Sequence, residues 1–343
     1  MAFLALQLLI KRAFLAVPIL LCVSALVFLI LRLLPADPIA MSVPPGATQA
    51  DYDMLRISFG LDRSLPEQYL IWLGKLLHGD FGGSIFFRRP VMELISKALP
   101  ATLELVSFGF MLGVVIGIAG GLGMFMLRGR WGEQVLDGST TVMMAIPEFL
   151  WAILLILFLG VLVPVFPFIG RLAPDLTLPP AATGFLLVDA ALSLRFDLLM
   201  SVLAHMALPA LALAIGIAPL LMRVLRSSLL ETIHEDYVTQ ARLRGTSETR
   251  IVIRHAFPNA ALPTLSLIGV QGGFMFGGTV LVEMIFAYPG LGNLMIDAVR
   301  NHDLPVIQAV ALIYCILVLG INAVVDVIYL AVNPRLRLKG RAA

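Results

Sequence analysis

The feature that most limits the fold of this chain is a series of apolar runs long enough to cross a lipid bilayer. A helix needs about 20 apolar residues to span the hydrocarbon core. Six segments reach that length: 13–34, 99–127, 142–169, 198–222, 260–282 and 304–325. Only 13% of the 343 residues are charged, against about 25% in a soluble domain. Because lipid offers backbone groups no hydrogen-bond partners, each run is expected to be an α-helix.

The distribution of lysine and arginine orients these six spans. Basic residues gather on the short cytoplasmic loops of membrane proteins. A cytoplasmic N-terminus puts only Arg171, Arg195 and Arg300 in the last two outer loops. The inner segments then hold most of the positive charge, at Lys11, Arg12, Arg128, Arg130, Arg223, Arg226, Arg242, Arg244, Arg250, Arg254, Arg335, Arg337, Lys339 and Arg341. We therefore predict a multi-pass protein of the cytoplasmic (inner) membrane with both termini in the cytoplasm.

The domain organisation follows from these spans. Residues 1–34 form an N-terminal transmembrane helix; their apolar run is too long for a signal-peptide core and is read as retained. Residues 35–98 form an extracytoplasmic segment, expected to fold as short helices on the outer surface. Residues 99–334 form the main transmembrane domain, and 335–343 a cytoplasmic tail. A second outer insertion covers 171–197, where the apolar stretch 176–188 is too short to span and is expected to be interfacial or re-entrant.

A polar cytoplasmic loop at 227–263 has the pattern of a helix, a glycine break and a second helix. Tyr237, Ala241 and Arg244 share one face at helical spacing, and Gly245 can take the left-handed conformation that ends a helix. Ser247 and Glu248 suit the start of the next helix. The small side chain of Ala241 suits a narrow groove, and the arginines around it can pair with acidic groups. The loop is therefore expected to be a stiff knob that contacts a soluble partner.

This loop resembles the EAA loop of binding-protein-dependent ABC importers of the type I class. It is most similar to the loop of the dipeptide/oligopeptide/nickel permease family. The glutamate that gives the loop its name in other importers is Thr239 here, as is usual in the peptide branch. The residues that carry the resemblance are Asp236-Tyr237, Ala241-Arg242 with Gly245, and Arg254-His255-Ala256 with Asn259, Ala260 and Pro263.

The resemblance extends over nearly the whole chain. Motifs in the family's order are Leu61-Asp62 with Tyr69, Gly79-Asp80-Phe81-Gly82, Pro100-Ala101-Thr102-Leu103-Glu104-Leu105, Glu283 with Ile285-Phe286, Tyr288-Pro289-Gly290-Leu291-Gly292, Asp303-x-Pro305 and Asn333-Pro334-Arg335. The stretches Thr183-Gly184-Phe185 with Asp189, and Ala204-His205-Met206 with Leu208-Pro209, resemble dipeptide permeases in particular. The implied fold is an all-α membrane protein of six transmembrane helices, the type I ABC importer transmembrane domain with a cytoplasmic coupling helix.

The resemblance also implies two sets of functional residues. Contact with an ATPase is expected at Asp236, Tyr237, Ala241, Arg242, Arg244, Gly245, Arg254 and His255. Gating or pathway roles are expected at Glu283, Tyr288, Pro289, Gly290, Gly272 and Gly273. For Glu283 a helix cap or an interfacial position is an equal alternative, and Glu104, Glu148 and Asp297 are read as caps or interfacial groups. The glycine-rich runs 109–123 and 269–278 are expected to pack closely against a partner permease.

The sequence contains no catalytic constellation and no Gly-x-x-x-x-Gly-Lys-Ser/Thr phosphate loop. The chain is therefore expected not to be an enzyme and to bind no cofactor or metal; ATP and Mg would belong to partner subunits. The implied partners are a homologous second permease in a heterodimer, two ATP-binding subunits, an extracytoplasmic substrate-binding protein and membrane lipid, but no nucleic acid. The implied function is import of peptides, with dipeptides as the first expectation.

Several alternatives stay open at this point. The same subunit class carries nickel, glutathione, oligopeptides or haem, and selection rests largely with a binding protein that the chain does not contain. A secondary transporter would carry interior carboxylates or interrupted helices in paired halves, and the middle positions of the expected spans lack carboxylates. An intramembrane hydrolase would need paired aspartates or a Ser/His arrangement within the spans, and none is found.

Overall fold

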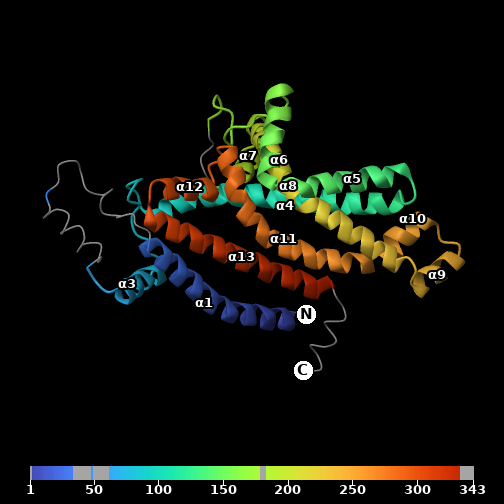
Figure 1. Ribbon diagram of the computed structural model, residues 1–343, viewed down its shortest axis with the longest axis horizontal. Helices are drawn as coiled ribbons and strands as arrows, with labels where there is room; N and C mark the ends of the chain where they lie inside the picture. The colour runs from blue at the N-terminus through green and yellow to red at the C-terminus, as the bar shows by residue number, and fades with distance from the viewer. Residues whose placement is uncertain (1, 34–47, 49–61, 178–182, 333–343) are drawn as a thin grey trace.

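Long helices that run side by side dominate the computed structural model, which describes residues 2–33, 48, 62–177 and 183–332 (Figure 1). Five of them are long and apolar enough to cross a membrane, either alone or together with the short helices that lead into them. They are α1 (Ala2–Leu33), α4 (Val91–Met126), α8 (Phe196–Thr232), α11 (Phe257–Ile285) and α13 (Leu304–Val332). Within the described residues there is no strand, only an isolated bridge between Gly83 and Pro90. The all-α prediction is confirmed.

The sixth span is a bent pair of helices rather than a straight one. Helix α5 (Trp131–Ala145) is followed by α6 (Glu148–Leu155) and the π-helical η1 (Ile156–Leu162), and the two halves meet at 106°. Ile146 is extended because the residue before a proline disfavours helical backbone, and Pro147 follows it. Six spans are reached when this pair is counted as one. The third span was expected over 142–169 with interruptions only late, at Pro164 and Pro167; in the structure it begins at Trp131, ends at Leu162 and is broken at Pro147.

Short helices occupy the two ends of the long bundle (Figure 1). One end carries α3 (Leu65–Leu77) and α12 (Leu291–Arg300), and the opposite end carries α9 (Asp236–Leu243), α10 (Glu248–Arg250) and the π-helical η2 (Ile251–Ala256). Helix α3 agrees with the short helices expected in 35–98, although most of 34–61 lies outside the described residues. Of the expected interfacial piece 176–188, residues 178–182 also lie outside them, and α7 (Leu186–Leu192) covers its end.

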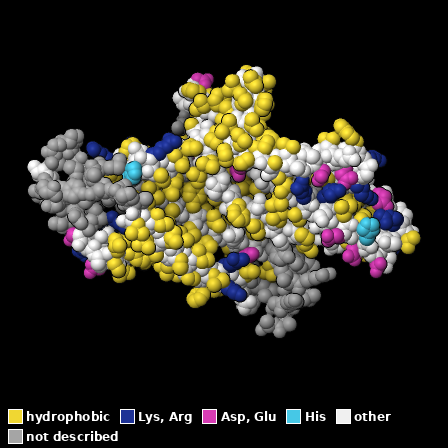
Figure 2. Space-filling model, viewed as in Figure 1, with side chains coloured by type: hydrophobic (Ala, Val, Ile, Leu, Met, Phe, Trp, Pro, Cys, Tyr) yellow, Lys and Arg dark blue, Asp and Glu magenta, His cyan; other side chains and the backbone are white. Residues whose placement is uncertain are grey.

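The charge distribution distinguishes the ends of the molecule from its middle. In Figure 2 the middle is covered by apolar side chains, whereas charged side chains gather over the end formed by α9 and α10. The N-terminal half of α1 and the C-terminal half of α13 point toward that same end (Figure 1), and an ion pair between Arg12 and Asp326 joins them. The apolar band matches the hydrocarbon region that six spans require.

A stripe of glycines joins α4 to α8. Gly109, Gly113, Gly117 and Gly121 recur every four residues on one face of α4, and each lies against one residue of α8. The facing residues have the same spacing: Leu213, Ile217, Leu221 and Leu225. A Cβ atom added at Gly113 would lie 2.5 Å from Ile217 Cγ1, so the two helices approach as closely as glycine allows. The expectation that this run packs against a partner permease is therefore wrong for these four positions.

The second glycine run also packs within the chain. A Cβ atom at Gly272 would lie 3.2 Å from Ile321 of α13, and one at Gly273 would lie 3.5 Å from Val318. These two positions, predicted to allow gating, thus lie where α11 crosses α13. Only Gly277 in this run faces open space, with nothing within 4 Å of the added Cβ.

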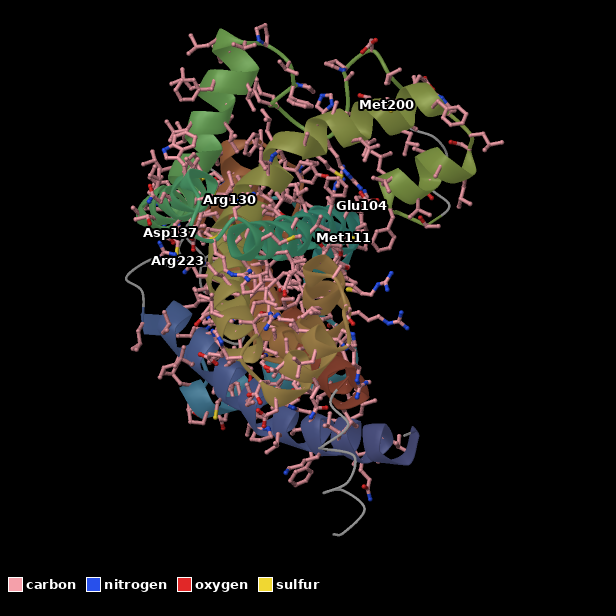
Figure 3. The ribbon with its side chains drawn as sticks, turned by 90° about the vertical axis from the view of Figure 1, so that its right-hand side faces the viewer. Glu104, Met111, Arg130, Asp137, Met200 and Arg223 are labelled. Carbon is pink, nitrogen blue, oxygen red and sulfur yellow. The ribbon has the colours of Figure 1, made fainter. Side chains whose placement is uncertain are left out.

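Polar side chains tie α5 to α8 in the half of the bundle nearest α9. Arg223 Nε donates to Thr140 Oγ1 at 3.1 Å and Arg223 Nη2 to Thr141 Oγ1 at 2.6 Å. Arg226 forms an ion pair with Glu133. Figure 3 labels Arg223 beside Asp137, at the place where these two helices meet. Hydrogen bonds and a salt bridge therefore hold the first half of the bent span to the bundle.

Candidate functional site

The first candidate site is the knob formed by α9 and the turn that follows it. The N–H of Gly245 donates to the carbonyl of Arg242 at 3.0 Å, and the N–H of Thr246 to the carbonyl of Ala241 at 3.3 Å. This pair of bonds is the Schellman arrangement that closes a helix. Gly245 has φ of +79°, a conformation that residues with a Cβ atom rarely adopt. The predicted glycine break is confirmed in its position and its conformation.

An apolar cluster fixes the knob to the transmembrane helices. Val238 and Ala241 of α9 are buried in the same cluster as Ile251 and Val252 of η2. The cluster continues into the spans through Phe125, Leu225, Leu229, Ala256 and Ala260. Ala241 is only 7% exposed, so its small side chain allows close packing inside the chain. It does not line the outer face that a partner would contact.

The charged residues of the knob divide into paired and open groups. Arg242 and Glu248 form an ion pair across the turn, with Nε–Oε1 and Nη2–Oε2 distances of 2.5 and 3.1 Å. Arg242 is thus engaged within the chain, whereas Asp236, Arg244 and Arg254 are exposed and His255 is half-buried. They belong to α9, the turn after it and η2, which lie at the charged end seen in Figure 2. The open groups are the ones available to an acidic or basic partner surface.

Two features of the exposed face of the knob add to the sequence prediction. The Tyr237 hydroxyl accepts a hydrogen bond from Asn259 Nδ2 at 2.9 Å, which holds the ring over the start of α11. Leu243 is 84% exposed and was not singled out from the sequence. The sequence does contain a signal for Leu243. It is an apolar residue on a polar helix, and its position five residues after Val238 puts it on a different face from that buried residue. Tyr237 and Leu243 give the knob an apolar contact surface among its charges.

The second candidate site lies at the opposite end, around Glu283. This side chain is fully buried, and its carboxylate accepts hydrogen bonds from Thr102 Oγ1 at 2.6 Å, Gly292 N at 2.7 Å and Asn293 N at 3.2 Å. The two backbone donors belong to the first turn of α12, where an anion is favoured. The Glu283 carboxylate thus caps the N-terminus of α12.

The turn between α11 and α12 closes tightly over this carboxylate. Tyr288 is fully buried, and its N–H donates to the carbonyl of Glu283 at 2.8 Å. A Cβ atom at Gly290 would overlap the Glu283 carboxylate, so glycine is required beside Pro289. The structure thus brings Glu283, Tyr288, Pro289 and Gly290 together as one packed unit. Gly272 and Gly273 are not part of it.

A buried ion pair missed by the sequence analysis organises the outer insertion. Glu104, labelled in Figure 3, is buried in α4 and pairs with Arg171. Its other oxygen accepts from Leu187 N at 2.8 Å, at the start of α7. The pair satisfies both charges in a buried environment, where an unpaired charge would be costly. Glu104 was read as a cap or interfacial group, and it does cap α7, but from inside the protein.

Glu148 contradicts one premise of the sequence analysis. It is the first residue of α6 and follows the break in the bent span 131–162, so a carboxylate does occupy the middle of a span. Its Oε1 atom is buried and accepts no hydrogen bond from the described residues. The error came from placing the start of the third span at 142 instead of 131, eleven residues too late, which moved Glu148 near its end.

Two family models cover most of the chain. Residues 109–338 match the model described as binding-protein-dependent transport system inner membrane component. Residues 5–106 match the model for the N-terminal part of a binding-protein-dependent transport system membrane component. The matched residues include the knob, α12 and both glycine runs.

Curated relatives match over nearly their full length. The dipeptide transport system permease protein DppB of Escherichia coli (strain K12) is 34% identical over 337 residues, which are 97% of this chain and 99% of the relative. The glutathione transport system permease protein GsiC of the same strain is 34% identical over 334 residues, 96% of this chain and 98% of the relative. This identity over this length indicates common descent.

A solved structure agrees with the fold. A chain of the MetNI methionine ABC transporter in an inward-facing conformation superposes with a TM-score of 0.54 at 19% identity, covering 71% of this chain and 97% of that chain. At this identity the likeness concerns the arrangement of helices alone. It agrees with the expected type I importer fold.

Proposed function

Because this chain belongs to the family of binding-protein-dependent transport system inner membrane components, we propose that it is a permease subunit for peptides, with dipeptides as the preferred substrates. Family membership itself makes it a multi-pass inner-membrane permease component of an ABC importer. The secondary transporter and intramembrane hydrolase alternatives are thereby set aside. The proposal concerns the cargo, the partners and the way in which the chain is powered.

The names of the full-length relatives support peptides as the cargo. One relative is named for dipeptides and the other for glutathione, which is itself a tripeptide. Both are 34% identical to this chain, so identity does not separate them. Glutathione is therefore the second candidate substrate. Nickel, oligopeptides and haem are the further alternatives that the sequence left open.

The observation that carries the mechanism is the knob. It is a protruding helix with exposed Tyr237, Leu243 and Arg244, fixed by an apolar cluster to α4, α8 and α11. The chain has no phosphate loop, so ATP and Mg would bind to two partner ATPase subunits. A groove on an ATPase would receive the knob, and closure of the ATPases would move the spans with it. The knob end then lies in the cytoplasm, together with both termini.

The other partners follow from the same orientation. A homologous second permease would complete a heterodimer, and the translocation pathway would run between the two chains. The substrate-binding protein would dock at the opposite end of the bundle, where α3 and α12 lie. Glu283 would act there by holding α12 in place for docking.

The test is reconstitution of this chain with its second permease, ATPases and binding protein in proteoliposomes. We expect dipeptides to stimulate ATP hydrolysis and to accumulate inside, while the same vesicles without the ATPases do neither. Parallel assays use glutathione, nickel ions and haem. Stimulation by nickel or haem with no response to either peptide would overturn the proposed cargo.

A further inference from the structure

The break in the bent span places a carboxylate in an unusual position. Glu148 follows Pro147 directly, at the point where α5 and α6 meet at 106°. Its side chain reaches away from its own helix to two others. A Cβ atom at Gly216 of α8 would lie 3.0 Å from Glu148 Oε2, and one at Gly278 of α11 would lie 2.5 Å from the same oxygen. The carboxylate therefore fills a notch that exists because both positions are glycine.

The notch provides no partner for the charge. Glu148 Oε1 is buried without a hydrogen bond from the described part of the chain. Glu148 as a whole is half-buried, whereas the buried carboxylates singled out above are satisfied: Glu104 pairs with Arg171, and Glu283 accepts three hydrogen bonds. Burying a carboxylate oxygen without a hydrogen-bond partner is unfavourable. An ionisable group at membrane depth therefore indicates a site on a substrate pathway.

The notch opens onto a face that this chain leaves uncovered. Gly216, whose added Cβ would lie against the carboxylate, is exposed. Gly216 and Gly278 leave no side chain on the two sides of the carboxylate that they face. A ligand that enters at the exposed Gly216 would therefore meet an unpaired negative charge.

We propose that Glu148 holds the cationic amino terminus of the transported peptide in the translocation pathway. This inference rests on the proposed function, because it requires a peptide substrate. A lone carboxylate suits an ammonium group, which needs one charge and short hydrogen bonds. A resident metal ion would need more ligands, and no group of three His, Cys, Asp or Glu side chains is placed to hold one within the described residues.

The experiment uses the reconstituted complex with saturating, peptide-loaded binding protein. Glu148→Gln keeps the shape and removes the charge; we expect uptake to fall about tenfold or more, the loss expected when a charge-assisted hydrogen bond is removed. ATP hydrolysis stimulated by the binding protein should stay close to the wild-type rate, because the knob is untouched. Glu148→Asp, which keeps the charge, should restore part of the uptake.

Two neighbouring glycines supply a matched pair of variants. Gly278→Ala places a methyl group against the carboxylate and should reproduce the loss of uptake seen with Glu148→Gln. Gly277→Ala adds the same methyl group in open space and should leave uptake near the wild-type rate. A dipeptide with a diazirine in its first side chain should label residues around Glu148 in the vanadate-trapped complex. The label should disappear with Glu148→Gln.

The outcomes separate this inference from the proposed function. A wild-type complex that imports no peptide contradicts the proposed function itself. Normal uptake by Glu148→Gln in a complex that does import peptides overturns the role of Glu148, as does labelling only elsewhere. Loss of the second permease from the Glu148→Gln complex during size-exclusion chromatography would also overturn it, because the carboxylate would then serve subunit pairing.

Discussion

At the scale of single residues, two positions hold the turns at opposite ends of the bundle. Gly245 supplies the left-handed conformation that ends α9, and Glu283 supplies the negative charge that starts α12. A larger residue at Gly245, or a neutral residue at Glu283, would change the backbone around that position. A substitution at each position therefore tests whether transport requires a rigid turn at that end of the molecule.

Replacing Gly245 by valine should uncouple the knob. A β-branched residue at φ of +79° carries a strain of about 1–2 kcal/mol, so the turn and the Arg242–Glu248 pair across it should shift. We expect peptide uptake and peptide-stimulated ATP hydrolysis to be lost while the protein remains in the membrane fraction. Gly138→Val is the control, because Gly138 lies in α5 with nothing near its added Cβ. Full transport by Gly245→Val would contradict the coupling role.

Replacing Glu283 by alanine should destabilise the outer end. Thr102 and two backbone N–H groups of α12 would lose their acceptor, at a cost of roughly 1–3 kcal/mol for each buried donor left unsatisfied. We expect the purified complex to unfold several degrees lower and to bind the loaded binding protein more weakly. Its preference among dipeptides should not change. A changed preference with unchanged thermal stability would instead favour the pathway role that the sequence suggested.

At the scale of elements, the pairing of α4 with α8 is the most extensive helix contact among the described residues. The pairing depends on four glycines facing four large side chains at the same spacing. A spacing of four residues is close to the helical repeat, so one straight stripe of contact forms. The pattern was visible in the sequence as a run of small residues. Which helix fills it was not, because small faces accept either an internal or an external partner.

Replacing Gly113 by alanine should separate these helices locally. The added methyl group would lie 2.5 Å from Ile217 Cγ1 and 2.6 Å from Ile217 Cδ1, and such overpacking costs about 1–3 kcal/mol. Ile217→Ala in the same chain should restore stability by emptying that space. Gly123→Ala is the comparison, since its Cβ would meet Leu136 at 3.7 Å. The measurement is thermal unfolding of the complex carrying Gly113→Ala, Ile217→Ala, both substitutions together, or Gly123→Ala. Additive effects of Gly113→Ala and Ile217→Ala on the unfolding temperature would contradict the direct contact.

The bent span shows where reading elements from sequence failed. The apolar run from Val142 onward suggested a helix that starts there. Apolar content, however, does not show where a helix changes direction. The helix starts earlier, at Trp131, because α5 is a more polar segment whose partners on α8 are arginines. Only the restriction that Pro147 places on Ile146 could have indicated the break. The turn of the knob, by contrast, was predictable, because the left-handed backbone conformation that ends α9 favours glycine and can be recognised from the neighbouring residues alone.

At the scale of the whole molecule, the sequence predicted the all-α class, the six spans that result when the bent pair counts as one, and the position of the glycine turn in the knob. It did not predict which buried charges meet. Glu104 and Arg171, 67 positions apart, pair in the fold, and no local pattern announces such a contact. Charges within helices were read as caps or interfacial groups because the partners that bury them come from distant segments.

The orientation of the molecule can be measured directly. With Cys22 and Cys315 changed to serine, a single cysteine at Thr239 on the knob and another at Lys75 on α3 report opposite ends; both residues are exposed. A membrane-impermeant maleimide added to intact spheroplasts should label the Lys75→Cys protein and leave the Thr239→Cys protein unlabelled. Lysis should expose both. The reverse pattern would contradict cytoplasmic termini.

The glycine stripe has a mechanical consequence for α8. That helix is 37 residues long, about 55 Å at the rise of an α-helix, and it carries Pro209 and Pro219 within its length. A proline removes one backbone hydrogen bond and makes a hinge in a free helix. The contacts from Gly109 to Gly121 reach α8 between Leu213 and Leu225, on both sides of Pro219, so α4 acts as a splint there. A small tilt imposed at the end of α8 nearest α9 would then pass Pro219 and reach Leu213 without being absorbed as a bend at that proline.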